Sequence, residues 1–131
     1  MAAAVRVLFV EDESLIRLVT SQALQDEGFE VVEAWNGDEA AKLLDSPDGF
    51  DVLFTDVQMP GTLDGLDVAM HARRRYPGIP VLVVSGYAPH LVRRLDALEP
   101  LAVFIGKPYR LDELITAIRR LTTTLWLVPP P

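Results

Sequence analysis

Short apolar runs alternate with helix-like segments five times along the chain, and this alternation constrains the fold more than any other feature. The expected strands are 5–10, 30–34, 51–55, 80–84 and 101–105, and the expected helices are 14–27, 38–45, 66–76, 89–98 and 111–121. Most of the strands are apolar throughout, which indicates burial on both faces. Alternating strands and helices imply right-handed crossovers. We therefore predict an α/β fold with a five-stranded parallel sheet.

Helix signals support these segments. In the first helix Leu15, Leu18, Val19 and Leu24 recur at helical spacing, and Gly28 follows as a C-terminal cap. The last helix carries a single apolar stripe that ends near Leu121. We therefore place one domain at 1–121 and a C-terminal tail, apolar and then proline-rich, at 122–131.

The composition argues against several classes of protein. A formal net charge of −7 argues against a protein that binds nucleic acid by itself, because such proteins carry a basic stripe. The absence of cysteine excludes disulfides and thiolate metal sites and suits the cytoplasm. No apolar run reaches the length of a membrane span, and we identify no targeting segment.

Charged and hydroxyl side chains follow four of the expected strands. Glu11 and Asp12 follow the first strand, Asp56 the third, Ser85 the fourth and Lys107 the fifth. In an open parallel sheet, ligands bind outside the carboxyl ends of the strands. These five side chains are therefore expected to meet at one edge of the sheet.

Three carboxylates at one edge repel each other, by roughly 4 kcal/mol per pair at about 4 Å and an effective dielectric near 20. Either some acids take up protons or a cation binds. Mg²⁺ fits, because it takes oxygen ligands from few carboxylates and keeps several waters. Lys107 and Ser85 would offer a positive charge and a hydroxyl to a phosphoryl group, and Asp56 would be free to form an aspartyl-phosphate.

These residues lie within segments that resemble the receiver domain of two-component response regulators, in the stand-alone style of the chemotaxis regulator. The matching segments are Val7–Asp12, Ala34–Ala40, Asp56–Pro60, Asp64–Gly65, Ser85–Gly86 and Lys107–Pro108. Each segment is weak alone, but their order and spacing are specific and span nearly the whole chain. The resemblance implies a doubly wound, flavodoxin-like (βα)5 fold with strand order 2-1-3-4-5.

The resemblance also implies a phosphoacceptor and a metal site. Asp56 matches the phosphoacceptor. Glu11 and Asp12 match the acidic pair that holds Mg²⁺ together with Asp56. Gln58, two residues past the acceptor, matches the position whose backbone carbonyl joins the metal.

Three further positions match the groups that sense the phosphoryl group. Ser85 matches the switch hydroxyl, and Lys107 matches the phosphate-binding lysine, whose bond to Pro108 is typically cis. Phe104 matches the switch aromatic that swings inward on activation.

Partners follow from the same resemblance. A sensor histidine kinase or a histidine phosphotransfer protein would donate the phosphoryl group, and an unknown downstream protein would read it, with a homodimer possible. Such a module is not an enzyme acting on a separate substrate, although it catalyses its own phosphotransfer and slow autodephosphorylation. The expected location is cytoplasmic, without membrane contact.

The chain departs from the family pattern in two regions. The loop 59–65 is one residue longer than the usual form, and Pro89 and Glu99–Pro100 alter the segment around the fourth helix. The acidic positions are unaffected by these changes.

Other functions remain open on the residues alone. Glu11 and Asp12 could simply favour the first helix through its dipole, and Asp56 could cap a turn. A haloacid-dehalogenase-type phosphatase also uses an aspartyl-phosphate, but it needs a second acid where this chain has Gln58. A binding module that uses the fold without phosphorylation is the third hypothesis. Gly37 and Gly65 are interpreted as turn geometry rather than ligand contacts.

Overall fold

The computed structural model describes residues 4–86, 94, 96, 98 and 101–127. Its five strands are β1 (Arg6–Val10), β2 (Glu30–Ala34), β3 (Val52–Asp56), β4 (Val81–Ser85) and β5 (Ala102–Gly106). All neighbouring strands are parallel, and their order is β2-β1-β3-β4-β5. The predicted α/β fold and strand order are therefore confirmed.

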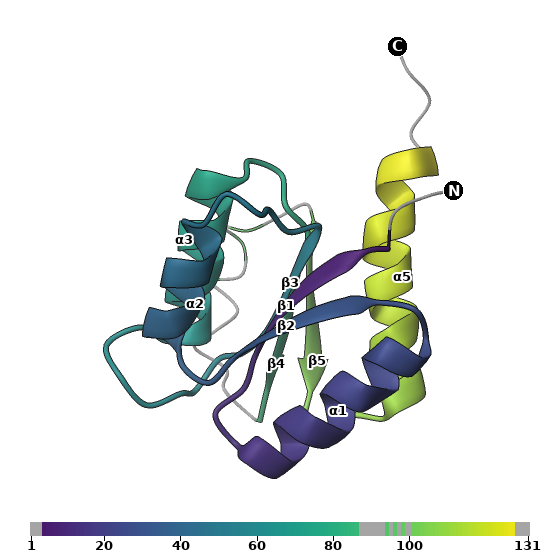
Figure 1. The fold of residues 1–131 in the computed structure, drawn as a ribbon, viewed down its shortest axis with the longest axis horizontal. Coiled ribbons are helices and arrows are strands. Elements are labelled where there is room, and N and C mark those ends of the chain that lie inside the picture. Colours follow the sequence, from purple (N-terminus) through teal and green to yellow (C-terminus); the bar gives the residue numbers. More distant parts are fainter. Residues whose placement is uncertain (1–3, 87–93, 95, 97, 99–100, 128–131) are drawn as a thin grey trace.

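Four helices are described around this sheet: α1 (Ser14–Asp26), α2 (Gly37–Leu44), α3 (Gly65–Arg75) and α5 (Leu111–Leu127). α2 and α3 cover one face of the sheet, and α1 and α5 cover the other (Figure 1). The predicted helix at 89–98, with Pro89, lies almost wholly outside the described residues, as does Glu99–Pro100. α5 continues to Leu127 instead of ending at Leu121. No helix in the described ranges is both long and apolar enough to cross a membrane.

The core consists of two layers, one on each face of the sheet. Leu8 and Val10 of β1 pack toward α2 and α3, whereas Val7 and Phe9 pack toward α1 and α5, and all four side chains are at most 1% exposed. Burying one such side chain contributes about 1.5–3 kcal/mol. Apolar residues on both faces explain why the strands read as continuous apolar runs.

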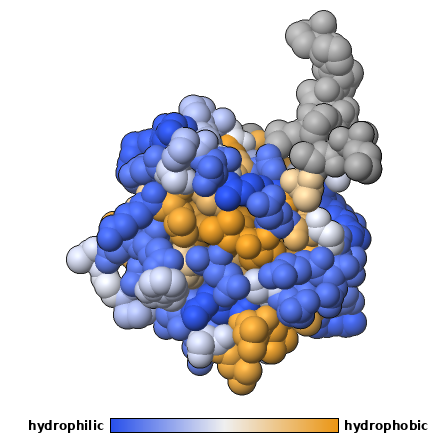
Figure 2. Space-filling view, in the orientation of Figure 1, coloured by the Kyte–Doolittle hydropathy of each residue, from blue (hydrophilic) through white to orange (hydrophobic). Residues whose placement is uncertain are grey.

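α1 presents an unexpected face to the sheet. Leu15, Leu18 and Val19 are 71%, 64% and 50% exposed, while Thr20 and Ser21 point inward. Figure 2 shows an apolar patch at the lower edge of the molecule, where Figure 1 places α1. The apolar spacing thus predicted the helix correctly. Most of the apolar residues in that pattern nevertheless face solvent, because polar contacts occupy part of the face of α1 that lies on the sheet.

The start of α3 rests directly on the end of β3. A Cβ at Gly65 would lie 1.9 Å from the backbone oxygen of Asp56, so only glycine fits there. A capping box fixes the same end: Asp64 accepts from the Asp67 amide at 2.8 Å, and Asp67 accepts from the Asp64 amide at 3.0 Å. Gly65 is therefore required by close packing rather than by the turn geometry that the sequence suggested, because it begins α3 without a positive φ.

The loop between β3 and α3 is tied to the start of α2. The Thr62 hydroxyl donates to Asp38 at 2.7 Å, and Gly61 adopts a φ of 105° beside the same carboxylate. A Cβ at Gly37 would lie 2.4 Å from the backbone oxygen of Leu63. The loop between β3 and α3 is thus held in its middle as well as at its ends.

Replacing Gly65 by alanine should lower the free energy of unfolding by about 1–3 kcal/mol, because the new methyl group overlaps the Asp56 backbone. Chemical denaturation measures the loss. Gly106→Ala is the matched control, because a Cβ there meets nothing within 4 Å. Equal stability of the two variants would contradict the close contact.

Candidate functional site

Backbone pairing brings the predicted site residues to one edge of the sheet. Glu11, directly after β1, is 2% exposed, and Asp56, the last residue of β3, is 6% exposed. The Glu11 amide donates to the Ala34 carbonyl at 3.0 Å, and the Lys107 amide donates to the Ser85 carbonyl at 2.7 Å. The parallel ladder therefore continues past the strand ends and fixes the residues that follow them.

Three carboxylates converge at this edge. One oxygen from each of Glu11, Asp12 and Asp56 lies within 4.8 Å of the others. The Lys107 ammonium donates a hydrogen bond to Asp56 Oδ2 and lies 3.8 Å from Glu11 Oε1. The structure thus brings together four of the predicted site residues.

The cluster is short of positive charge. One lysine faces three carboxylates, and Glu11 Oε2 is buried without a hydrogen-bond partner among the described residues. Burial raises the pKa of the Glu11 carboxyl to about 7, with Asp56 adding to the rise and Lys107 opposing it. A small divalent cation would supply the missing charge and a partner for the orphaned oxygen.

Lys107 stays a cation in this setting. Burial alone would lower the pKa of its ammonium, but the hydrogen bond to Asp56 and the charges of Asp56 and Glu11 outweigh burial and raise it. The Lys107–Pro108 peptide bond is cis, as the resemblance implied. The lysine is therefore a fixed positive charge beside Asp56.

The remaining predicted residues lie at different distances from the cluster. Ser85 ends β4, is 2% exposed and follows Val84, the register partner of Asp56. The backbone amide of Gln58 donates to Asp56 Oδ1 at 3.3 Å. Phe104 lies within β5, is 44% exposed and is not part of the carboxylate cluster. The roles assigned to these residues remain predictions.

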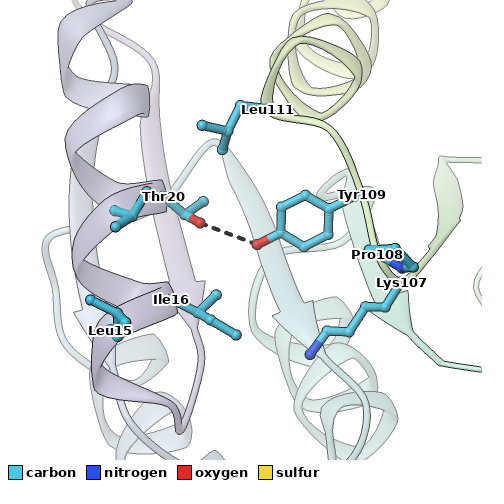
Figure 3. A pocket seen from close by; sticks show the side chains of 8 residues that line it. Leu15, Ile16, Thr20, Lys107, Pro108, Tyr109 and Leu111 are labelled. Atoms are coloured by element: carbon cyan, nitrogen blue, oxygen red, sulfur yellow. Dashed lines mark hydrogen bonds between the residues drawn. The ribbon is translucent and has the colours of Figure 1, made fainter.

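Tyr109 and Thr20 were not identified from the sequence. Their hydroxyls face each other at 3.2 Å between α1 and the segment after β5, with Lys107 and Pro108 at one end (Figure 3). The Tyr109 ring also packs edge-to-face on Phe54, with centroids 6.3 Å apart. No spacing pattern marks this pair, because the two residues come from opposite ends of the chain.

An apolar groove of about 540 Å³ runs beside these hydroxyls. Its lining residues are Leu15, Ile16, Val19, Thr20, Lys107, Pro108, Tyr109 and Leu111. Lys107 thus takes part in both the groove and the carboxylate cluster.

Known proteins are similar to this chain over most of its length. The model of the response regulator receiver domain family matches residues 7–119. The chain is 33% identical over 122 residues to the sensor kinase CckA of Brucella abortus, covering 92% of this chain and 13% of the kinase. It spans 13% to 54% of the length of the curated relatives considered.

Two solved structures are similar over nearly their full length. A response regulator receiver protein from Sinorhizobium medicae superposes with a TM-score of 0.83 at 31% identity, covering 92% of this chain and 95% of that one. The response regulator TrrA from Thermotoga maritima, solved in complex with Mg²⁺ and BeF, gives a TM-score of 0.75 at 30% identity, covering 89% and 98%.

In the presence of EDTA, stability should fall as the pH rises from about 4.5 through about 7, because the folded protein keeps a proton on Glu11 that the unfolded chain releases near 4.5. The stabilisation is fully present below the lower value, and at about 1.4 kcal/mol per pKa unit its full loss amounts to on the order of 3 kcal/mol. Urea unfolding at about pH 5 and about pH 8 measures the change.

Glu11→Gln should flatten this pH dependence, and Glu13→Gln, at an exposed neighbouring position, should leave it intact. Identical pH profiles for wild type and Glu11→Gln would contradict the raised pKa.

Proposed function

The chain belongs to the response regulator receiver domain family, and from this premise we propose that it is a phosphorylation-controlled signalling module with Asp56 as phosphoacceptor. The observation that carries the proposal is the contact of the Lys107 ammonium with Asp56, inside a cluster that also holds Glu11 and Asp12. Phosphoryl transfer depends mainly on positioning and charge neutralisation, and this cluster offers both.

The residues fit a bound Mg²⁺. Glu11, Asp12 and Asp56 would hold it with the backbone carbonyl of Gln58, and the orphaned Glu11 Oε2 and the uncompensated negative charge both favour a cation. The Mg²⁺ complex of the similar TrrA supports this assignment. When bound, the ion neutralises charge on the phosphoryl oxygens.

The chain's own side chains would carry the transfer. An Asp56 carboxylate oxygen attacks the phosphorus of a phosphohistidine, the phosphorus–nitrogen bond breaks, and the nitrogen keeps the electron pair. Lys107 faces Asp56 and would pair with a phosphoryl oxygen, since its ammonium is compact and stays charged. The product is an aspartyl-phosphate on Asp56.

The new group would be sensed at two positions. By analogy with other side-chain phosphates it adds about −1.5 to −2 charges. Ser85, at the end of the neighbouring strand, would donate its hydroxyl to the phosphoryl group, and Phe104, half-exposed on β5, would swing inward. Phosphorylation would in this way bias two existing states of one surface.

We further propose the partners and setting. A sensor histidine kinase or a histidine phosphotransfer protein donates the phosphoryl group in the cytoplasm, and an unidentified protein or a second copy of the chain reads it. The module acts on no separate substrate: Gln58 stands where a haloacid-dehalogenase-type phosphatase needs its second acid. Binding without phosphorylation is the alternative that the following experiment separates.

Incubation with acetyl phosphate and Mg²⁺ should add one phosphoryl group to the protein, detected by intact-mass spectrometry. Asp56→Asn should abolish the addition, because the amide is not a nucleophile of this kind. Asp48→Asn, at an exposed aspartate elsewhere, is the matched control and should be labelled like wild type. Absence of labelling in wild type, with a partner that binds Asp56→Asn equally well, would favour the module without phosphorylation.

Lys107→Met should slow phosphorylation at saturating Mg²⁺ by about a hundredfold, because it removes a fixed charge from the developing transition state. Initial rates from the same mass measurement give the ratio. Lys42→Met, at an exposed lysine on α2, should react at the wild-type rate. A Lys107→Met rate equal to wild type would remove Lys107 from the proposed machinery.

A further inference from the structure

Arg17, on the inner side of α1, contacts the backbone of the acidic turn. Its side chain is 18% exposed, and its guanidinium donates to the Glu11 carbonyl at 2.7 Å and lies 3.5 Å from the Asp12 carbonyl. Both of these residues contribute a carboxylate to the cluster that they form with Asp56. The bonds use main-chain oxygens, so the carboxylates themselves stay free for another ligand.

Glu33 on β2 holds the other side of the guanidinium. Arg17 Nε lies 3.3 Å from Glu33 Oε1, and the Ser21 hydroxyl donates to Glu33 Oε2 at 3.2 Å. The ion pair offsets the arginine charge close to the cluster, so a second cation meets less repulsion there. The guanidinium is thereby fixed between α1, β2 and the turn.

A strand of the sheet also holds this turn. The Glu11 amide donates to the Ala34 carbonyl of β2, and the Glu11 carbonyl accepts from Arg17, so the peptide groups on both sides of this residue are hydrogen-bonded. Asp12 is exposed, and one of its carboxylate oxygens lies within 4.8 Å of those of Glu11 and Asp56. The backbone from which both acids extend therefore contacts the same guanidinium.

We propose that Arg17 is a positioning residue for the divalent cation: it sets the Glu11–Asp12 turn in its ligating arrangement before the ion arrives, with Glu33 as its counter-ion. The inference rests on the Mg²⁺ site of the proposed function and adds a determinant of its affinity. Partners of metal ligands typically account for 10- to 100-fold in metal affinity, because they pre-orient the ligating groups.

The same strand pair provides a matched control at its other end. Arg6 Nε lies 3.3 Å from Glu30 Oε1 of β2, the Arg6 guanidinium donates to the Gly49 carbonyl, and its side chain is 21% exposed. Arg6→Gln therefore removes a network of the same kind from the start of β1, whereas Arg17→Gln removes it from the acidic turn beyond the end of β1. A purely structural arginine would behave alike in both places.

The experiment compares Arg17→Gln, Arg17→Lys and Arg6→Gln with wild type. Calorimetric titration gives the Mg²⁺ affinity, and acetyl phosphate labelling over a range of Mg²⁺ gives the half-saturating concentration and the maximal rate. We expect Arg17→Gln to weaken Mg²⁺ binding about tenfold or more, with the maximal rate unchanged. Arg6→Gln should keep the wild-type affinity even where its stability falls as far.

Two further readouts separate positioning from folding. In EDTA, amide hydrogen exchange at residues 11–14 should be faster in Arg17→Gln and unchanged in Arg6→Gln. Arg17→Lys should show an intermediate Mg²⁺ affinity. Its single ammonium can reach the Glu11 carbonyl but has no second nitrogen with which to bind Glu33 at the same time. If Arg17→Gln does not fold, Arg17→Lys makes the same comparison.

Equal Mg²⁺ affinities for Arg17→Gln and Arg6→Gln would overturn the inference, as would a loss of maximal rate with unchanged affinity. In either case a wild type that still binds Mg²⁺ and is phosphorylated would leave the proposed function standing. A wild type that binds no Mg²⁺ would overturn both.

Discussion

The ammonium of Lys107 is the interaction on which the rest of the site depends. Among the described residues, this ammonium contacts both Asp56 and Glu11. It lies at the edge of the sheet where three carboxylates come close together. Each unscreened pair of such acids costs several kcal/mol at partial burial, on the order of 4 kcal/mol at an effective dielectric near 20. One ammonium cannot balance three acids, so the site keeps an attraction for a further cation.

The parallel sheet explains why these groups meet at all. Residues far apart in the chain, Glu11 and Lys107 among them, follow strands whose carboxyl ends point the same way. Backbone hydrogen bonds between neighbouring strands continue past the strand ends, so the backbone fixes the positions of these residues. The stacked rings of Phe9 and Phe54, 4.4 Å apart, and the edge contact of Tyr109 extend the packed core up to this edge. The packed apolar core thus lies directly beneath the carboxylate cluster.

The sequence was sufficient for the parts of the molecule governed by local pattern. Apolar runs predicted the five strands, and the charged residues at the ends of three of them predicted the members of the carboxylate cluster and its lysine, because strand direction alone brings them to one edge. The orientation of α1 was not predictable in the same way. Leu15 and Leu18 have the spacing of a buried stripe, yet the inner face of the helix is partly occupied by Arg17 and Ser21, whose partner Glu33 belongs to another element. Long-range polar pairs leave no periodic signal.

The contacts of the loop between Asp56 and Gly65 limit where the surface around the carboxylate cluster can change shape. One end is Asp56, the other is a glycine packed against the carbonyl of that residue, and Thr62 is hydrogen-bonded to Asp38 in between. The residues between these fixed points leave the most room for a change in loop length. Gly61, with its left-handed φ of 105°, is one of them. A change in the length of this loop would therefore alter the rim around the Asp56 carboxylate, and with it the shape met by an approaching protein, without moving the carboxylate cluster beneath.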